Sequence, residues 1–173
     1  NLLFESNVMP SAENTLCPLG GFSQLYRVNL KGGRPVMYSS FPMDMISFSK
    51  ERKSFLYQDI KGFENKWRKH HTSSVTRDIW HCTIQDNAPE VETVKNASFV
   101  KITDFKGEDR NPVMAPDGKS FYYLSESDGT LNIYKSNLAE AVKNGKAAKT
   151  QITKYSGNPV RFLSIAENGT LCY

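Results

Sequence analysis

The sequence lacks the uninterrupted apolar run of ~18 residues that a membrane-spanning helix needs, so no membrane insertion is expected. It is also poor in metal ligands, because only three cysteines and three histidines are scattered along its 173 residues. No cysteine pair or carboxylate stands at ligand spacing from the histidines. We therefore expect no metal, no cofactor and no disulfide framework, and interpret each cysteine as a small buried apolar residue.

The sequence has almost no charge imbalance outside one segment. Residues 60–77 contain five basic residues and one acidic residue, a surplus that equals the formal net charge of +4 of the whole chain. A segment of this kind attracts carboxylates or an acidic neighbouring subunit. Nucleic acid is not an expected partner, because one basic loop on an otherwise balanced surface falls short of a basic stripe.

The two ends of the sequence lack the features of natural termini. The chain starts without a methionine or a basic leader, on residues that resemble a strand, and it stops on the apolar residues 169–173. We therefore expect a piece of a longer protein. The compartment stays open, with an exported, periplasmic protein as the first expectation and a cytoplasmic one as the alternative.

The chain contains an internal repeat. Three segments share one pattern, in which a polar, an aliphatic and an aromatic residue are followed by three variable positions and another aliphatic residue. They start 54 residues apart, which is close to the period of a propeller blade. The segments are residues 24–30, 78–84 and 132–138.

Two further kinds of element recur around these segments. Hairpins, each with a hydrophobic strand, a polar turn and an aromatic-rich strand, are expected at residues 46–57, 113–124 and 162–173. Short outer strands are expected at residues 35–38, 99–103 and 150–153. One unit is then a four-stranded antiparallel sheet. The fold class predicted from this pattern is all-β, a fragment of a β-propeller with two full and two partial blades.

The expected blades follow the repeat. The chain as a whole, residues 1–173, is expected to form a partial propeller. Its parts are a partial blade at residues 1–45, a blade with an inserted basic loop at 46–104, a blade at 105–155 and the start of the next blade at 156–173. One helix is expected at residues 138–143, in a connection between strands rather than in the core, and Asn144 and Gly145 supply its stop signal.

Part of the repeat resembles a known family. Residues 110–119 and 125–134 resemble the "NPxxSPDGKxxxxxSxxDGxxxIY" repeat of TolB-like and tricorn-type propellers. Residues 65–80, with Gly62 before them, and residues 158–163 look like the N-terminal propeller of tricorn-type serine peptidases in particular. The resemblance covers most of the chain.

The resemblance implies a non-catalytic part of a peptidase. In that family the serine nucleophile and its partners lie in later domains, and the propeller guides peptides or unfolded segments to them and takes part in assembly. The chain departs from the repeat at Ala115, where the family has serine, and at residues 50–52, which replace a Pro-Asp-Gly turn. A TolB-like interaction module in a non-peptidase parent is the alternative.

The inserted loop holds the candidate binding residues, which are Trp67, Arg68, Lys69, His70, His71 and Arg77. The arginines could grip a carboxylate, with the tryptophan supplying apolar area beside it. In the competing interpretation the loop is merely solvated, and an Arg77–Asp78 pair and Trp67 pin it to the blade.

No catalytic residue is expected in this loop. Neighbouring histidines in an extended segment point to opposite sides, and no Gly-x-Ser-x-Gly elbow is present. A small-molecule enzyme on the same scaffold would need a ring of inward polar residues from successive blades. The unpaired strand edges of an incomplete ring also predict self-association.

Overall fold

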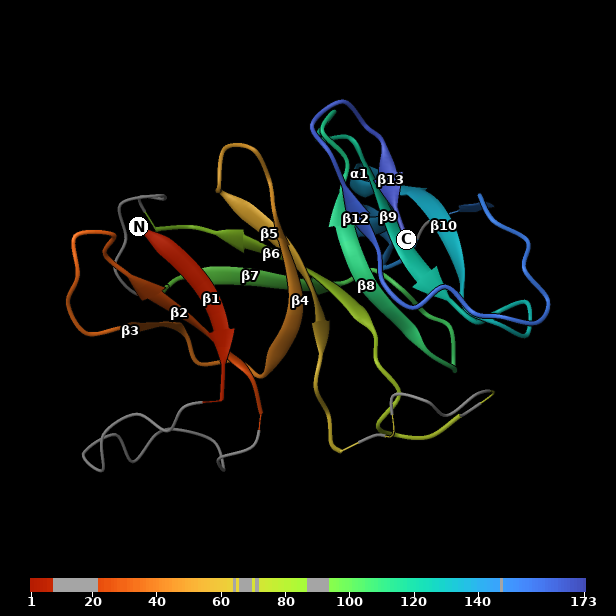
Figure 1. The fold of residues 1–173 in the computed structure, drawn as a ribbon, viewed down its shortest axis with the longest axis horizontal. Helices are drawn as coiled ribbons and strands as arrows, with labels where there is room; N and C mark the ends of the chain where they lie inside the picture. The colour runs from red at the N-terminus through yellow and green to blue at the C-terminus, as the bar shows by residue number, and fades with distance from the viewer. Residues whose placement is uncertain (8–21, 64, 66–69, 71, 87–93, 147) are drawn as a thin grey trace.

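The computed structural model describes residues 1–7, 22–63, 65, 70, 72–86, 94–146 and 148–173. The chain forms four antiparallel sheets that follow one another across the molecule (Figure 1). The first has three strands in the order β1-β2-β3. These strands are β1 (Leu2–Ser6), β2 (Gln24–Val28) and β3 (Val36–Ser39).

The next two sheets each have four strands in simple meander order. The second sheet consists of β4 (Met43–Phe48), β5 (Ser54–Asp59), β6 (Ile79–Ile84) and β7 (Ala97–Lys101). The third consists of β8 (Asp109–Met114), β9 (Ser120–Ser125), β10 (Asn132–Asn137) and β11 (Lys149–Gln151). A last pair, β12 (Ser164–Ile165) and β13 (Leu171–Cys172), begins a fourth sheet. The predicted class, an all-β propeller fragment with two full and two partial blades, is confirmed.

The core lies between successive sheets rather than within one of them. Side chains alternate across each strand, so Phe55 and Tyr57 of β5 pack toward the first sheet, while Leu56 packs toward the third. A third cluster joins the third sheet to the start of the fourth through residues such as Leu124 and Leu163. Each blade is therefore stabilised chiefly by its neighbours, which is the packing of a propeller.

The first strand of the second sheet and the first strand of the third sheet each contain a β-bulge. β4 and β8 lie against each other, and each shifts register against its partner strand near a residue with positive φ. These residues are Met45, with φ of 52°, and Asn111, with φ of 50°. Asparagine tolerates this conformation better than methionine does. Each strand therefore contains a β-bulge beside its residue with positive φ.

Asn111 connects three sheets. Its backbone N–H donates to Gln58 Oε1 in the second sheet at 2.9 Å, and its Nδ2 donates to the carbonyl of Leu163 before β12 at 2.9 Å. Both bonds are buried. The asparagine of the Asn-Pro motif thus links three consecutive sheets through two buried hydrogen bonds.

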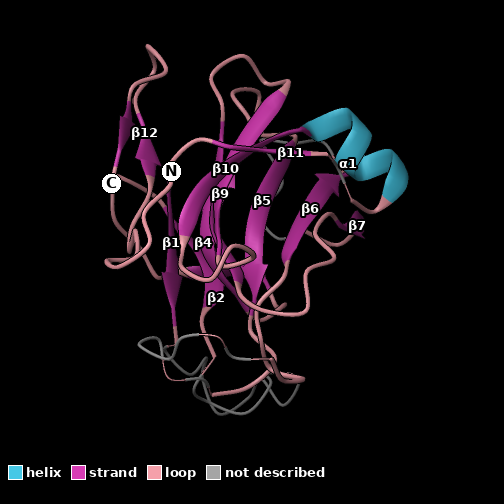
Figure 2. Cartoon of the chain, turned by 90° about the vertical axis from the view of Figure 1, so that its right-hand side faces the viewer, coloured by secondary structure: helices cyan, strands magenta, loops and turns pink. Residues whose placement is uncertain are grey.

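The single described helix, α1 (Leu138–Asn144), follows β10 as expected. The Asn137 side chain caps it by accepting from the backbone N–H of Glu140, and Gly145 ends it at φ of 69°. The helix lies in the connection between β10 and β11, as expected, but one of its residues, Ala141, is fully buried and joins the core between the second and third sheets. Figure 2 shows α1 close to β7, where the β10–β11 connection covers the joint between the two blades.

The cysteines differ in their surroundings. Cys82 is fully buried, as expected, and burial raises the pKa of its thiol to about 12. Cys172 is exposed, so the expectation of burial is wrong for this residue, because the short strand β13 has only β12 beside it among the described strands. Cys17 lies outside the described residues.

The part of the chain that the structure describes contains no helix with the length and apolar character that crossing a bilayer requires.

Candidate functional site

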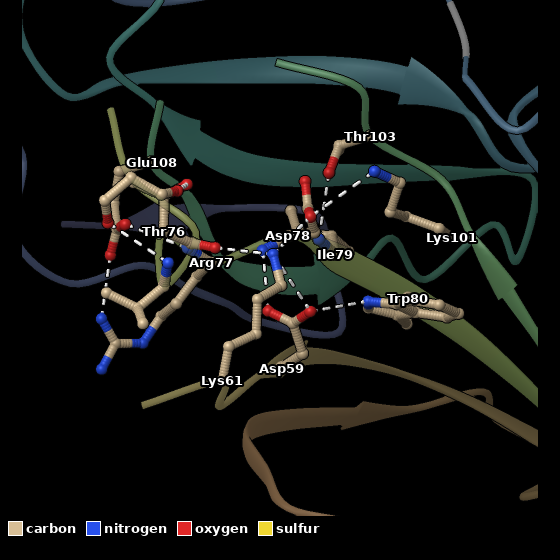
Figure 3. Close-up of polar contacts among 12 residues, drawn as sticks. Asp59, Lys61, Thr76, Arg77, Asp78, Ile79, Trp80, Lys101, Thr103 and Glu108 are labelled. Atoms are coloured by element: carbon tan, nitrogen blue, oxygen red, sulfur yellow. Dashed lines mark hydrogen bonds and ion pairs between the residues drawn. The ribbon is translucent and has the colours of Figure 1, made fainter. Parts of the chain in front are cut away.

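The two ends of the inserted segment, residues 60–77, are clamped together at the end of β5. Lys61 Nζ donates to Asp78 Oδ2 at 2.6 Å and to the carbonyl of Thr76 at 2.7 Å, and it lies 3.4 Å from Asp59 Oδ2. Figure 3 shows this lysine between the two aspartates. We call Asp59, Lys61, Thr76 and Asp78 the loop base. One lysine therefore joins the start of the segment to its end.

The carboxylates of the loop base are held by neighbouring donors. Asp59 accepts from the backbone N–H of Asp78 at 2.9 Å and from Trp80 Nε1 at 3.0 Å. Lys101 Nζ lies 3.5 Å from Asp78 Oδ2. Burial opposes the charge on Lys61, but the hydrogen bonds and negative charges of Asp78 and Asp59 outweigh it and raise the pKa of this lysine. Lys61 is therefore charged at neutral pH.

Arg77 anchors the segment to the next blade. Its Nη1 donates to Glu108 Oε1 at 2.9 Å, and its backbone N–H donates to Glu108 Oε2 at 3.1 Å. The side chains of this pair are only 8% and 11% exposed. The Arg77–Asp78 pair of the competing interpretation does not form. Arg77 pairs with Glu108, the residue before β8 of the third sheet, and Asp78 pairs with Lys61.

Two more contacts extend the segment over the third sheet. The backbone N–H of His70 donates to Glu126 Oε2 at 3.1 Å, and Thr76 Oγ1 lies 3.3 Å from the carbonyl of Lys106. His70 is exposed and has φ of 54°. The described residues His70, Thr76 and Arg77 of the segment therefore contact residues beyond the second sheet.

The predicted binding residues divide into two groups. Trp67, Arg68, Lys69 and His71 lie outside the described residues. Of the other two, Arg77 is buried against Glu108, whereas the His70 side chain is exposed. The structure thus gives Arg77 an internal carboxylate as its partner and leaves the binding role of the other five as a prediction.

A polar groove opens beside the loop base. It has a volume of about 380 Å³ and runs between the segment and the connection that follows β7. Its lining combines hydroxyl groups and three lysines, Lys61, Lys101 and Lys106, with the carboxylates of Asp78 and Asp104. Such a lining offers hydrogen-bond donors to an extended acidic chain.

A second cavity lies at the bulged ends of β4 and β8, where the sequence analysis placed no site. Its volume is about 140 Å³. Charged and amide residues from successive sheets line it together with Met45 and Phe162, and most of the surface that faces the cavity is apolar. Its lining consists of Asp44, Met45, Gln58, Arg77, Arg110, Asn111, Arg161 and Phe162, and we call it the inner cavity. The arginine that precedes the Asn-Pro motif was the signal that could have revealed it.

The succession of four-stranded sheets, packed face to face with their first strands side by side, defines the chain as a segment of a β-propeller. Its fold is that of the TolB and tricorn propellers. A putative TolB from Agrobacterium tumefaciens matches with a TM-score of 0.60 and 20% identity, over 86% of this chain and 43% of that protein. TolB from Acinetobacter baumannii matches with a TM-score of 0.56 and 19% identity, over 86% and 30%.

The tricorn protease is similar to the same degree. It matches with a TM-score of 0.59 and 23% identity, over 83% of this chain and 12% of the protease. The chain thus spans less than half the length of each of these proteins. At such identities the likeness shows the fold. No family model and no curated protein matches the sequence.

Proposed function

We propose that the chain is a non-catalytic propeller segment that binds acidic peptide or protein segments at the surface formed by residues 60–77. The observation that carries this proposal is an inserted segment that holds the whole surplus charge of the chain and is anchored across two blades. Lys61 and Arg77 are used by the anchors. Lys66, Arg68 and Lys69, which lie outside the described residues, are the cations we propose for a partner.

The proposed parent is a tricorn-type serine peptidase, in which this segment would serve peptide access, substrate binding or assembly. The likeness to the tricorn protease and the groove beside the loop base support this proposal. A TolB-like interaction module in a non-peptidase parent is the second candidate, and the TM-score of 0.60 with a TolB supports it equally. Sequence after Tyr173 separates the two: a PDZ-like and a serine-peptidase domain favour the first.

Charge reversal in the loop should weaken binding of an acidic peptide. We expect Arg68→Glu with Lys69→Glu to reduce the affinity for a fluorescent, unstructured Glu-rich peptide by about tenfold or more at low salt, because like charges then face each other. Fluorescence anisotropy measures the affinity. The loss should shrink as salt is added, because salt screens exposed charges.

The matched control places the same charge change elsewhere. Lys50→Glu with Lys53→Glu alters two exposed lysines in the turn between β4 and β5 and should leave the affinity near that of the unchanged protein. Equal losses in both double variants would refute the assignment to residues 60–77. Peptide hydrolysis that disappears on His71→Ala or Ser73→Ala would refute the non-catalytic role.

We also propose that the chain self-associates through its strand edges. β1 is the edge strand of a three-stranded sheet and β13 belongs to a two-stranded one, so both can offer backbone groups to another strand. Light scattering should show a mass that rises with protein concentration. A constant monomer mass up to high concentration would contradict this prediction.

A further inference from the structure

A third cavity lies between the connection that follows β7 and the connection that follows α1. Its volume is about 230 Å³. This is below the ~300–1,000 Å³ of pockets for drug-sized molecules, so the cavity suits a smaller ligand. Asp109 at the start of β8 and Tyr123 of β9 line it from the third sheet, and Phe105, Lys146 and Lys149 line it from the two connections. We call it the Asp109 cavity.

The carboxyl group of Asp109 forms the most deeply buried part of this cavity. The residue is only 2% exposed. Hydrogen bonds from Ser125 and Thr103 reach the carboxyl group, but its Oδ1 is buried without a hydrogen-bond partner among the described residues. Buried acceptors of this kind are rare in folded proteins, because they lose their contacts with water and gain none in return. Asp109 can therefore take a further donor.

Two lysines lie at the exposed side of the cavity, and only one of them is paired with an acid. Lys146 Nζ lies 3.2 Å from Asp104 Oδ2. Lys149 Nζ donates to Ser127 Oγ at 2.8 Å and lies 5.0 Å from the centre of the Tyr134 ring. Among the described residues, no carboxylate is within ion-pair distance of Lys149. An ammonium group has three donors, so Lys149 can bind an anionic partner as well.

The cavity thus presents a carboxyl group at its buried end and an ammonium group at its exposed end. A ligand with a positive charge at one end and a negative charge at the other matches both groups through charge-assisted hydrogen bonds. An ion of one sign leaves one of the two groups without a complement.

We propose that the Asp109 cavity binds a small zwitterion of the α-amino acid class, with the ligand ammonium donating to Asp109 and the ligand carboxylate accepting from Lys149. Phe105 and Tyr123 supply apolar area for the ligand side chain. The cavity shares Phe105 with the groove beside the loop base, but Asp109 and Lys149 do not line that groove. The proposal therefore does not depend on peptide binding at residues 60–77.

An NMR titration of the whole chain with alanine, methylamine and acetate tests the proposal. At about pH 8, above the pKa of about 7 to which burial raises Asp109, its carboxyl group is ionised. Alanine should shift amide signals of the residues that line the cavity and saturate at one ligand per chain. Methylamine and acetate, which each carry one of the two charges, should bind at least about tenfold more weakly. Equal binding of either ion, or no saturation by alanine at millimolar concentrations, would overturn the proposal.

Substitutions locate the site. Asp109→Asn and Lys149→Gln should each weaken alanine binding by about tenfold, since each removes one charge-assisted hydrogen bond. Asp117→Asn and Lys119→Gln make the same charge changes at exposed residues in the turn between β8 and β9 and should leave the affinity unchanged. Equal weakening by these matched controls would show a general charge effect and overturn the assignment.

Two further checks separate this site from folding and from the peptide surface. Circular dichroism verifies that each variant is folded, and Lys149→Gln, at an exposed residue, tests the site should Asp109→Asn fail to fold. Arg68→Glu with Lys69→Glu should leave alanine binding unchanged, whatever its effect on the acidic peptide. Loss of alanine binding in that double variant would contradict a separate site.

Discussion

Replacing Arg77 by leucine is expected to lower the free energy of unfolding by about 3–5 kcal/mol, because it leaves the buried carboxylate of Glu108 without its guanidinium partner. Glu108 is 11% exposed and accepts from Arg77 Nη1 at 2.9 Å. Without the guanidinium, only the backbone N–H of Arg77 still reaches this carboxylate from the segment. Urea unfolding followed by tryptophan fluorescence measures the change.

A double substitution separates two contributions to stability: the cost of leaving Glu108 buried without a partner, and the net stabilisation by the ion pair. Arg77→Leu combined with Glu108→Leu should recover much of the lost stability, since apolar residues of similar size often replace a buried ion pair without loss. The exposed pair of Lys53 and Glu51, 3.7 Å apart, is the matched control. Lys53→Leu should change stability by less than about 1 kcal/mol. A similar effect at Arg77 and Lys53 would contradict the structural role of the buried pair.

The strands could be predicted from the sequence because their signals are local and repeated. Phe55 and Tyr57 alternate with Leu56, and each face finds a neighbouring sheet to pack against. The aromatic strands recur with one spacing, so the expected segment at residues 132–138 coincides with β10 apart from its last residue, which begins α1. Period-two patterning and turn chemistry are enough to place such elements.

The partner of Arg77 could not be predicted, because the contact is long-range. Asp78 is its neighbour in sequence, but Glu108 lies 31 residues away and comes from another sheet. Choosing between these two acids requires the angle between the blades. That angle depends on packing and on the bonds of Asn111, which no local pattern encodes.

The inner cavity was missed for a related reason. Met45 takes positive φ although methionine has no preference for it, so the bulge in β4 is imposed by the fold. The last hairpin was aligned from Phe162, whereas β12 starts at Ser164. Arg110 and Arg161 are equivalent, because each lies five residues before the residue whose backbone N–H closes its hairpin, Ala115 or Ala166. The offset hid this equivalence.

The second large effect is expected at Asp109, whose ionisation should make stability depend on pH. Burial raises the pKa of this carboxyl from its ordinary 3.8 to about 7, although hydrogen bonds from Ser125 and Thr103 and the charge of Lys149 oppose the rise. Below the unfolded pKa the group is protonated in both states. Between the unfolded and the folded pKa, Asp109 is ionised in the unfolded state and protonated in the folded state, so the free energy of unfolding falls as pH rises. Above the folded pKa, Asp109 is ionised in the folded state as well, and the free energy of unfolding is then lower than at acidic pH by at most about 4 kcal/mol.

Asp109→Asn removes this titration and should flatten the fall in stability between about pH 4 and about pH 7. Part of the slope should remain, because burial and the nearby Asp44 also raise the pKa of Glu5 to about 7. Thermal unfolding across this pH range measures the slope. Asp117→Asn is the control, because hydrogen bonds from Lys119 and Ser120 lower the pKa of Asp117 from its ordinary 3.8. Its contribution to stability changes only below about pH 4, so this variant should leave the slope between about pH 4 and about pH 7 unchanged. An unchanged slope in Asp109→Asn would show that this carboxyl does not titrate in the folded protein as its burial requires.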